Sequence, residues 1–151
     1  MSPARQKLEQ GVLDRIIGYH LVRAQLTTRE IFFQAVGQPL DLRPVEYTLL
    51  MLLQANPPLT PKQLASALAL TAPNLTALLD KMQQRSLVER QPSPTDKRSQ
   101  LIVLSAAGQA MAQDALTRSA AMENGLDGVL SAGERAILLE LLKKVAAHRV
   151  E

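Results

Sequence analysis

The stretch Asp96-Lys97-Arg98-Ser99 is the part of the sequence whose residue types and spacing point most directly to chemistry. It lies within RQPSPTDKRSQ, residues 90–100, where prolines and serines surround a Lys-Arg pair. Adjacent cations on a proline-stiffened polar loop are typical of a surface that binds a polyanion, and the alternative is an ordinary solvated turn.

Side chains for catalysis or metal binding are scarce. The chain has no cysteine, and its two histidines, His20 and His148, lie far apart. It also lacks a glycine-rich phosphate loop and a motif of paired carboxylates. Thiol chemistry and cysteine-based zinc sites are excluded. We therefore expect no catalytic residue, no metal site and no cofactor, and an enzyme is the least favoured class.

The positive charge is concentrated in the middle of the chain. Residues 60–105 hold six basic and three acidic side chains, and this excess equals the whole net charge of +3. An excess of three charges can arise by chance, but a basic middle on a neutral frame is also typical of a polyanion-binding module.

Composition indicates one folded domain over residues 1–151. Hydrophobic residues make up 46% of the chain, enough for a real core at this length. No apolar run approaches the roughly 20 residues of a membrane span. The N-terminal MSPARQKLEQ has no apolar signal core, so we expect a cytoplasmic protein without a membrane partner.

Hydrophobic periodicity and capping residues predict four helices in the first half. A long helix covers residues 7–36 and is stopped by Gly37, Gln38 and Pro39. A central apolar helix begins near Pro44. Thr60 and Gln63 form a capping box for a short third helix. Thr71 is the expected cap of the fourth, whose buried stripe is Leu75, Leu78, Leu79 and Met82.

The second half is predicted to begin with a hairpin. LVERQ and QLIVLS read as two strands, and the polar loop between them should project into solvent. Ser105 caps the next helix, which Gly125 and Gly128 weaken at its end. The capping box SAGE, residues 131–134, opens a last helix with a leucine-rich surface.

This order of elements predicts a mainly α fold with a small β-hairpin wing. Two capped helices separated by a tight turn and followed by a hairpin form a winged helix-turn-helix. We place this lobe at residues 42–104, and the helical regions 7–36 and 105–148 outside it. The terminal helices carry more leucine than one such lobe could bury, which favours a homodimer.

Residues 64–111 resemble the core of the MarR family of bacterial transcription regulators. The resemblance is carried by Thr71-x-Pro73 with Thr76, Leu87-Val88-x-Arg90, Asp96-Lys97-Arg98-Ser99 and Leu104-Ser105-x-x-Gly108. The flanking helices agree in length and order. The resemblance implies that the helical regions 7–36 and 105–148 interlock around a two-fold axis and that the dimer binds a pseudo-palindromic double-stranded DNA operator.

The resemblance also implies roles for single residues. Arg98 would enter the minor groove, held by a salt bridge from Asp96, while Lys97 and Ser99 would meet phosphates. Asn74, Thr76 and Ala77 would face base edges, and Ala72 would permit close approach. The expected DNA-binding set is Thr60, Gln63, Thr71, Ala72, Asn74, Thr76, Ala77, Lys81, Arg85, Arg90, Asp96, Lys97, Arg98 and Ser99.

For part of this set a structural role competes with the DNA-binding role. Thr60 and Gln63 could bond phosphates or could serve only as helix caps. Lys81, Arg85 and Arg90 could attract DNA without reading its sequence, or could form a solvated face. The family often has Ser or Thr where this chain has Arg43, so we expect the helix at Pro44 to be less firmly capped.

A small-molecule effector is a further implication of the resemblance. Tyr19, His20 and Arg23 lie where the family commonly holds such a ligand, so a repressor released by a small aromatic or anionic molecule is the expected function. The competing interpretation is that His20 is a satisfied histidine of the dimer interface and that Arg23 faces the dimer partner. The chain lacks the cysteine of thiol peroxide sensors and the tryptophan and histidine sets of the urate-type and zinc-type subgroups.

A different class of function stays open at this point. A winged-helix module that binds other proteins, without binding DNA, would share the same order of elements. Such a module would not need Lys97, Arg98 and a small, polar outer face on the fourth helix together.

Overall fold

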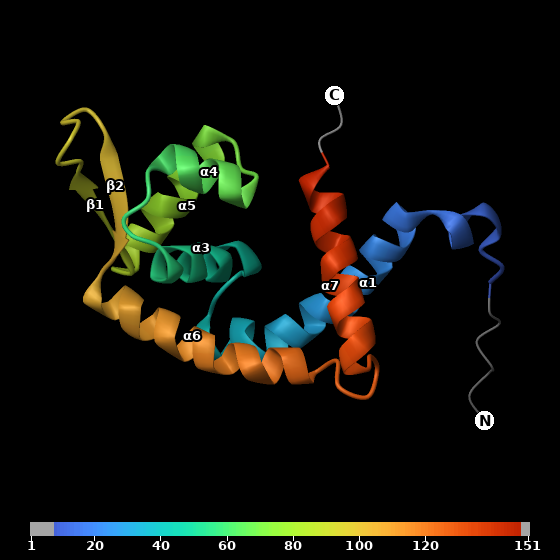
Figure 1. Ribbon diagram of the computed structural model, residues 1–151. Helices are drawn as coiled ribbons and strands as arrows, with labels where there is room; N and C mark the ends of the chain where they lie inside the picture. The colour runs from blue at the N-terminus through green and yellow to red at the C-terminus, as the bar shows by residue number, and fades with distance from the viewer. Residues whose placement is uncertain (1–7, 149–151) are drawn as a thin grey trace.

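The computed structural model describes residues 8–148, and these form an extended molecule with a lobe at one end (Figure 1). The lobe contains α3 (Pro44–Ala55), α4 (Pro61–Leu68), α5 (Ala72–Gln84) and the strands β1 (Val88–Pro92) and β2 (Gln100–Leu104). Helix α6 (Ala106–Asn124) leads away from it to α7 (Ala132–Ala147). The predicted class, mainly α with a β-hairpin wing, is confirmed.

The first long helix differs from its predicted bounds. A short 3-10 turn, Gly11–Arg15, precedes α1 (Ile17–Phe32), and the helical path then continues through a π-helical turn, Phe33–Gly37, into α2 (Gln38–Leu40). Gly37, Gln38 and Pro39 therefore do not stop the helix, and that prediction is wrong. The helix ends at Leu40, and the next residue, Asp41, adopts a left-handed conformation with φ 50°. Residue 7 lies outside the described residues.

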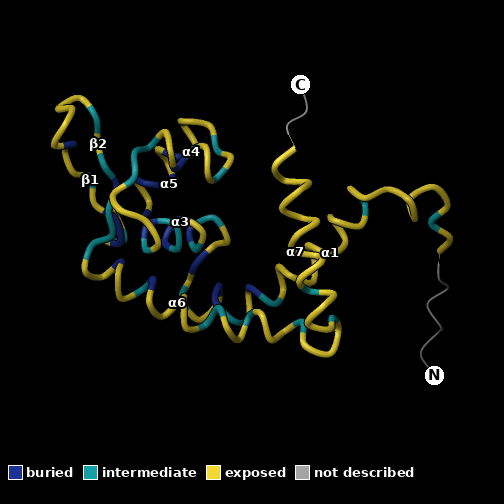
Figure 2. Tube along the Cα trace, in the orientation of Figure 1, coloured by how far each residue is buried: buried dark blue, intermediate teal, exposed yellow. Residues whose placement is uncertain are grey.

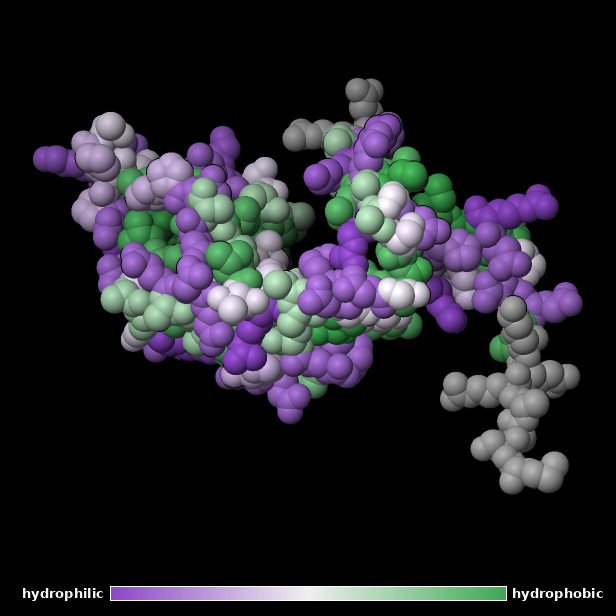
Figure 3. All heavy atoms as spheres, turned by 60° about the horizontal axis from the view of Figure 1, so that its bottom comes forward, coloured by the Kyte–Doolittle hydropathy of each residue, from purple (hydrophilic) through white to green (hydrophobic). Residues whose placement is uncertain are grey.

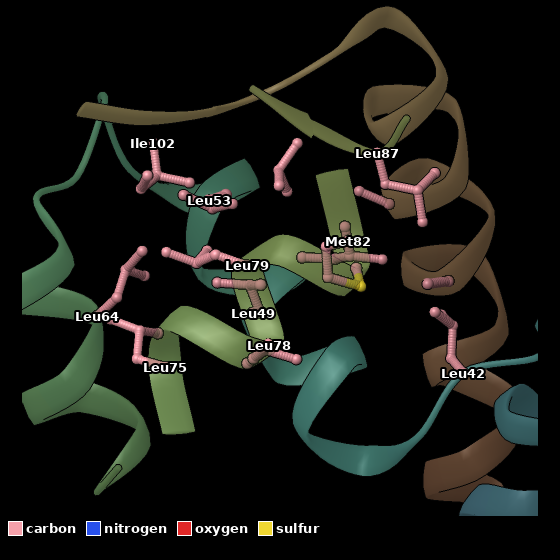
Figure 4. Close-up of a cluster of buried hydrophobic side chains, with 14 of the residues drawn as sticks. Leu42, Leu49, Leu53, Leu64, Leu75, Leu78, Leu79, Met82, Leu87 and Ile102 are labelled. Carbon is pink, nitrogen blue, oxygen red and sulfur yellow. The ribbon is translucent and has the colours of Figure 1, made fainter. Parts of the chain in front are cut away.

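The lobe has a leucine-rich core (Figure 4). Helix α5 directs Leu75, Leu78, Leu79 and Met82 inward, as its periodicity predicted. These side chains meet a buried set from the neighbouring elements, namely Leu42, Leu49, Leu50, Leu53, Leu64, Leu87, Val88 and Ile102. The core therefore holds α5 by its whole apolar stripe and leaves the opposite face of the helix in solvent.

The hairpin is antiparallel, and its two strands pair with each other from end to end. Val88 pairs with Leu104 and Pro92 with Gln100 at its two ends. Leu59, just before α4, forms an isolated bridge to Ile102, with Leu59 N–H donating to the Ile102 carbonyl at 3.3 Å and Ile102 N–H donating back at 2.8 Å. The wing is thus tied to the start of the helix-turn-helix as well as to its end.

The last two helices begin at serine N-caps, as predicted. Ser105 Oγ accepts from Gly108 N–H at 2.9 Å at the start of α6, which ends before Gly125. Ser131 and Glu134 form the expected capping box of α7, in which the Ser131 N–H donates to the Glu134 carboxylate at 2.8 Å. Arg135 of α7 then reaches back to Glu123 at 2.8 Å and to Asp127 at 3.0 Å.

Most residues of α1 and α7 are exposed (Figure 2), and large apolar side chains are among them. On α7, Ile137 is 59% exposed and Leu141 is 51% exposed; on α1, Val22 is 62% exposed and Leu26 is 63% exposed. Hydrophobic residues are visible at the surface of the molecule's helical end as well as on the lobe (Figure 3). None of the helices described within residues 8–148 has the length and apolar character to cross a bilayer.

Candidate DNA-binding surface

Helix α5 presents small and polar side chains to solvent at its N-terminal end. Ala72, Asn74, Thr76 and Ala77 are all exposed, while Leu75 between them is buried. Thr76 Oγ1 donates to the Ala72 carbonyl at 3.0 Å, which leaves its methyl group and the Asn74 amide free to meet a ligand. Amide and methyl groups on an exposed helix are suited to the edges and methyl groups of bases in a major groove.

The two helices of the helix-turn-helix begin with threonines that behave differently. At α4, Gln63 Oε1 accepts from Thr60 N–H at 2.9 Å, and Thr60 Oγ1 accepts from Gln63 N–H at 3.3 Å, so the predicted capping box is confirmed. At α5, Thr71 occupies the N-cap position, but its side chain accepts no hydrogen bond from the helix. Thr71 thus has the predicted position at the start of α5, but the prediction that its side chain caps the helix by a hydrogen bond is wrong. Its exposed hydroxyl accepts no bond from the helix.

The tip of the wing is closed by backbone bonds. Ser93 N–H donates to the Ser99 carbonyl, and Ser99 N–H donates to the Asp96 carbonyl, both at 2.9 Å. Lys97 and Arg98 are exposed on this turn and form no ion pair with any residue in the range 8–148. The structure thus places two cations without an ion-pair partner in the described residues at the projecting end of the hairpin.

Asp96 orders this turn, but not through the expected salt bridge. Its carboxylate accepts the backbone N–H of Arg98 at 2.9 Å and the hydroxyl of Ser99 at 2.9 Å. The Arg98 N–H and the Ser99 hydroxyl together lower the pKa of Asp96 from its ordinary value. The predicted Asp96–Arg98 ion pair is wrong, because a carboxylate two residues ahead of an N–H bonds more readily to that N–H. The Ser99 hydroxyl is likewise occupied as a donor to Asp96.

The other three predicted cations are held by acidic partners within the protein. Lys81 Nζ lies 2.7 Å from a carboxylate oxygen of Glu46, and Arg85 lies 3.6 Å from the other. Arg90 of β1 pairs with Asp80 of α5 at 2.6 Å. All three cations are thus paired with carboxylates, and their attraction of DNA stays a prediction.

Glu46 is the residue of this region that sequence reasoning missed. It is buried at the third position of α3, and its Oε2 accepts the N–H of Arg43 at 2.8 Å. The carboxylate therefore accepts the N–H of the N-cap residue, but the Arg43 side chain accepts no hydrogen bond from the helix, so α3 has half of a capping box where α4 and α7 have a whole one. The signal was present in the sequence, since a glutamate three residues after a helix boundary is half of a capping box.

The predicted effector residues lie on the surface of α1, outside the cavity described below. His20 is exposed and bonds through Nε2 to the Asp14 carbonyl at 2.9 Å, with Tyr19 packed edge-on against its ring. Arg23 is also exposed. A cavity of about 330 Å³ lies further along α1 instead; it is lined by Gln25, Thr28, Arg29, Phe32, Pro44, Tyr47, Thr48 and Met122. Its polar groups are hydroxyls, an amide and one guanidinium.

Together these features define a winged helix-turn-helix protein with an exposed recognition helix and a basic wing tip. Within residues 8–148 no group of three His, Asp or Glu side chains is placed to hold a metal ion.

Comparisons with known proteins place this architecture in a family. A family model described as MarR family matches residues 40–99. The multiple antibiotic resistance protein MarR of Escherichia coli (strain K12) is 32% identical over 71% of this chain and 75% of its own length. The chain therefore belongs to the MarR family, whose curated relatives are transcription regulators.

Solved structures agree over nearly the whole chain. The transcriptional repressor CouR bound to a 23-mer DNA duplex is 34% identical, with a TM-score of 0.86 over 93% of this chain and 99% of that one. The same repressor bound to p-coumaroyl-CoA is 33% identical, with a TM-score of 0.84 over 95% and 100% of the two chains.

Proposed function

We propose that this protein is a homodimeric repressor of transcription that binds a pseudo-palindromic DNA operator and is released by a small anionic or aromatic effector. The observation that carries this proposal is the pairing of two surfaces on one lobe. The outer face of α5 offers Asn74, Thr76 and Ala77, and the wing tip offers Lys97 and Arg98. The first surface suits base edges and the second suits phosphates and the minor groove. A cytoplasmic location follows from this function.

The exposed apolar faces of α1 and α7 support the dimer. A monomer rarely exposes so many large apolar side chains on two helices, and burying them stabilises by about 25 cal/mol per Å². Two copies related by a two-fold axis would present two recognition helices about one helical turn of DNA apart.

The cavity between α1 and α3 supports the effector. Arg29 supplies a positive charge, while Phe32 and Met122 supply apolar walls. This combination suits an aromatic molecule that carries an anionic group. The relatives point the same way, since CouR is described with p-coumaroyl-CoA bound. Tyr19, His20 and Arg23 stay predictions for an effector pocket between the dimerisation and DNA-binding parts.

The first experiment is footprinting on the DNA that flanks the gene, with titrations over a range of salt. A specific binder protects a two-fold symmetric site and loses affinity steeply as salt rises. Absence of binding at low salt would rule out the repressor and leave the protein-binding module as the function.

Arg98→Ala tests the wing directly. We expect it to weaken operator binding at least about tenfold, because the arginine lies on an ordered turn with no competing partner in the described chain. Gln91→Ala, an exposed polar change on β1 behind the tip, is the matched control. Equal affinities for Arg98→Ala and wild type would show that the wing does not enter the groove.

A further inference from the structure

Glu46 is the only charged side chain that is buried within residues 8–148. Its side chain is 1% exposed, at the start of α3 and beneath the C-terminal half of α5. A buried carboxylate costs several kcal/mol of lost hydration unless strong partners surround it. This residue therefore has a role that compensates for its burial.

Three cations surround the Glu46 carboxylate. Arg43 contacts Oε1 with its guanidinium at 3.0 Å, and Lys81 contacts the same oxygen at 2.7 Å. Arg85 approaches Oε2 at 3.6 Å. Arg43 stands at the boundary of α3, whereas Lys81 lies in the last turn of α5 and Arg85 is the C-cap residue of that helix. The carboxylate thus joins α3 to the recognition helix.

Capping of α3 does not by itself explain a charge at this position. Gln63 occupies the same third position in α4 and caps Thr60 N–H with a neutral amide oxygen at 2.9 Å. The chain therefore shows that an amide is sufficient for this bond. What an amide cannot supply is charge for Lys81 and Arg85, so the ionised form of Glu46 serves α5.

The contacts around Glu46 hold one flank of α5, and the wing holds the other. Arg85 also donates to the Asp41 carbonyl at 2.8 Å and to the Leu40 carbonyl at 3.4 Å, at the end of α2. Arg90 of β1 bonds to Asp80 and Gln83 of α5. The leucine stripe beneath α5 is apolar and non-directional. Directional bonds on the two flanks therefore fix the rotation and depth of the helix.

We infer that Glu46 is a positioning residue for DNA recognition, which sets how α5 presents Asn74, Thr76 and Ala77 to the major groove. This inference rests on the proposed function. Bonds to base edges depend steeply on distance and angle, whereas attraction to phosphates tolerates small shifts of a helix. Loss of the carboxylate charge should therefore reduce preference for the operator rather than attraction to DNA in general.

Glu46→Gln tests the inference, because glutamine keeps the cap and removes only the charge. Affinities for the footprinted operator duplex and for a random duplex are measured at one salt concentration, well below the melting temperature. We expect operator affinity to fall by about tenfold, the effect of losing one base contact, while random-duplex affinity stays within about twofold of wild type. Glu134→Gln, the same change in the α7 capping box, should leave both affinities at wild-type values.

A second variant keeps the test decisive if Glu46→Gln does not fold. Lys81→Gln leaves the α3 cap intact and should reproduce the loss of operator preference. The double variant Glu46→Gln/Lys81→Gln should be no worse than Glu46→Gln alone, because both changes break one pair.

The outcomes separate the inference from the proposed function. Failure of wild-type protein to bind any operator removes the proposed function, and the inference with it. Wild-type binding with an unchanged operator preference in Glu46→Gln overturns the inference alone. A parallel loss of operator and random binding in Lys81→Gln also overturns it, because that pattern would make Lys81 a phosphate contact.

Discussion

At the scale of single residues, two carboxylates organise the most basic part of the chain. Asp96 is exposed at the wing tip and holds a turn, and Glu46 is buried and holds a helix. Each accepts a backbone N–H from a residue two or three positions away, and each has a lowered pKa as a result. Acidic residues in a polyanion-binding surface are therefore part of its construction, because they place the cations around them.

Asp96→Ala should weaken DNA binding, although Asp96 itself would repel phosphate. The change removes the acceptor of Arg98 N–H and Ser99 Oγ, so the turn loses its order and Arg98 samples more positions. We expect a loss of between about threefold and tenfold in operator affinity, the value of one ordinary hydrogen bond. Asp96→Asn keeps an acceptor for the Arg98 N–H and should bind nearly as wild type. Stronger binding by Asp96→Ala would show that its charge, and not its hydrogen bonds, dominates.

Glu46 should make stability depend on pH in the acid range. Burial alone would raise the pKa of Glu46, but the Arg43 N–H and the Lys81 and Arg43 cations outweigh it and lower the pKa below the ordinary 4.5. The stability that the carboxylate contributes is therefore complete above the pKa of the unfolded chain and is lost as pH falls through the lower folded pKa.

Urea unfolding of wild type and Glu46→Gln checks this sign. At pH 7 the variant should be less stable by about 2 kcal/mol, the value of hydrogen bonds to a charged group. The difference should shrink steadily as pH falls from 5 to 3, while the difference between wild type and a neutral surface variant, Gln91→Ala, stays constant. A gap that is independent of pH would mean that packing, and not charge, accounts for the loss.

At the scale of elements, the helix starts were predictable because capping is local. Thr60 with Gln63, Ser105 with Gly108, and Ser131 with Glu134 all act within one turn of sequence. The hairpin and the apolar stripe of α5 were predictable for the same reason, because the spacing of their hydrophobic residues can be read directly from the sequence. A winged helix-turn-helix lobe follows from these signals alone.

Two features were missed from the sequence, one because of a local irregularity in the helix and one because it depends on distant contacts. Pro39 does not end the first helix, because it is the second residue of α2, directly after a π-helical turn that shifts the hydrogen-bond ladder. The partners of Lys81 and Arg85 come from α3 and α2, elements that only the tertiary fold brings beside α5. Periodicity says which face of a helix is polar, but it does not say which polar groups will be paired.

The junction of wing and α6 supplies a prediction at this scale. A Cβ built on Gly108 would lie 1.8 Å from the Leu87 carbonyl oxygen, a backbone atom that cannot move aside. Gly108→Ala should therefore destabilise the fold by at least about 3 kcal/mol, through overpacking at a backbone contact. Gly133→Ala, with no atom within 4 Å of its Cβ, is the matched control and should be neutral or stabilise by up to about 1 kcal/mol. Thermal unfolding of both variants checks the pair, and equal melting temperatures would contradict this packing.

At the scale of the whole molecule, the lobe buries its apolar side chains within one chain, but the helical end leaves its apolar side chains exposed. The lobe encloses a continuous core, whereas α7 buries no residue within this chain. Helix α7 is joined to α6 through Arg135, and its apolar side chains face outward. A helix with this surface is stable when a second copy covers it, so folding, assembly and DNA binding are coupled in the proposed dimer.

Leu141→Asp tests that coupling. Leu141 is 51% exposed in one chain, so the change costs the isolated fold little, but a charge in a covered apolar interface costs several kcal/mol. We expect sedimentation equilibrium to show monomers at micromolar concentration. Operator affinity should fall by at least about a hundredfold, because the second half-site contact ceases to be intramolecular. Affinity for a single half-site should stay near that of wild type, since the lobe is unchanged.

Ala110→Asp is the matched control, because it places the same charge on an exposed position of α6. It should remain a dimer and bind the operator as wild type does. A dimeric Leu141→Asp would show that α7 is not the interface. A monomeric Leu141→Asp with full operator affinity would show that one recognition helix and one wing are sufficient for the site, and the two-fold relation between protein and operator would then be wrong.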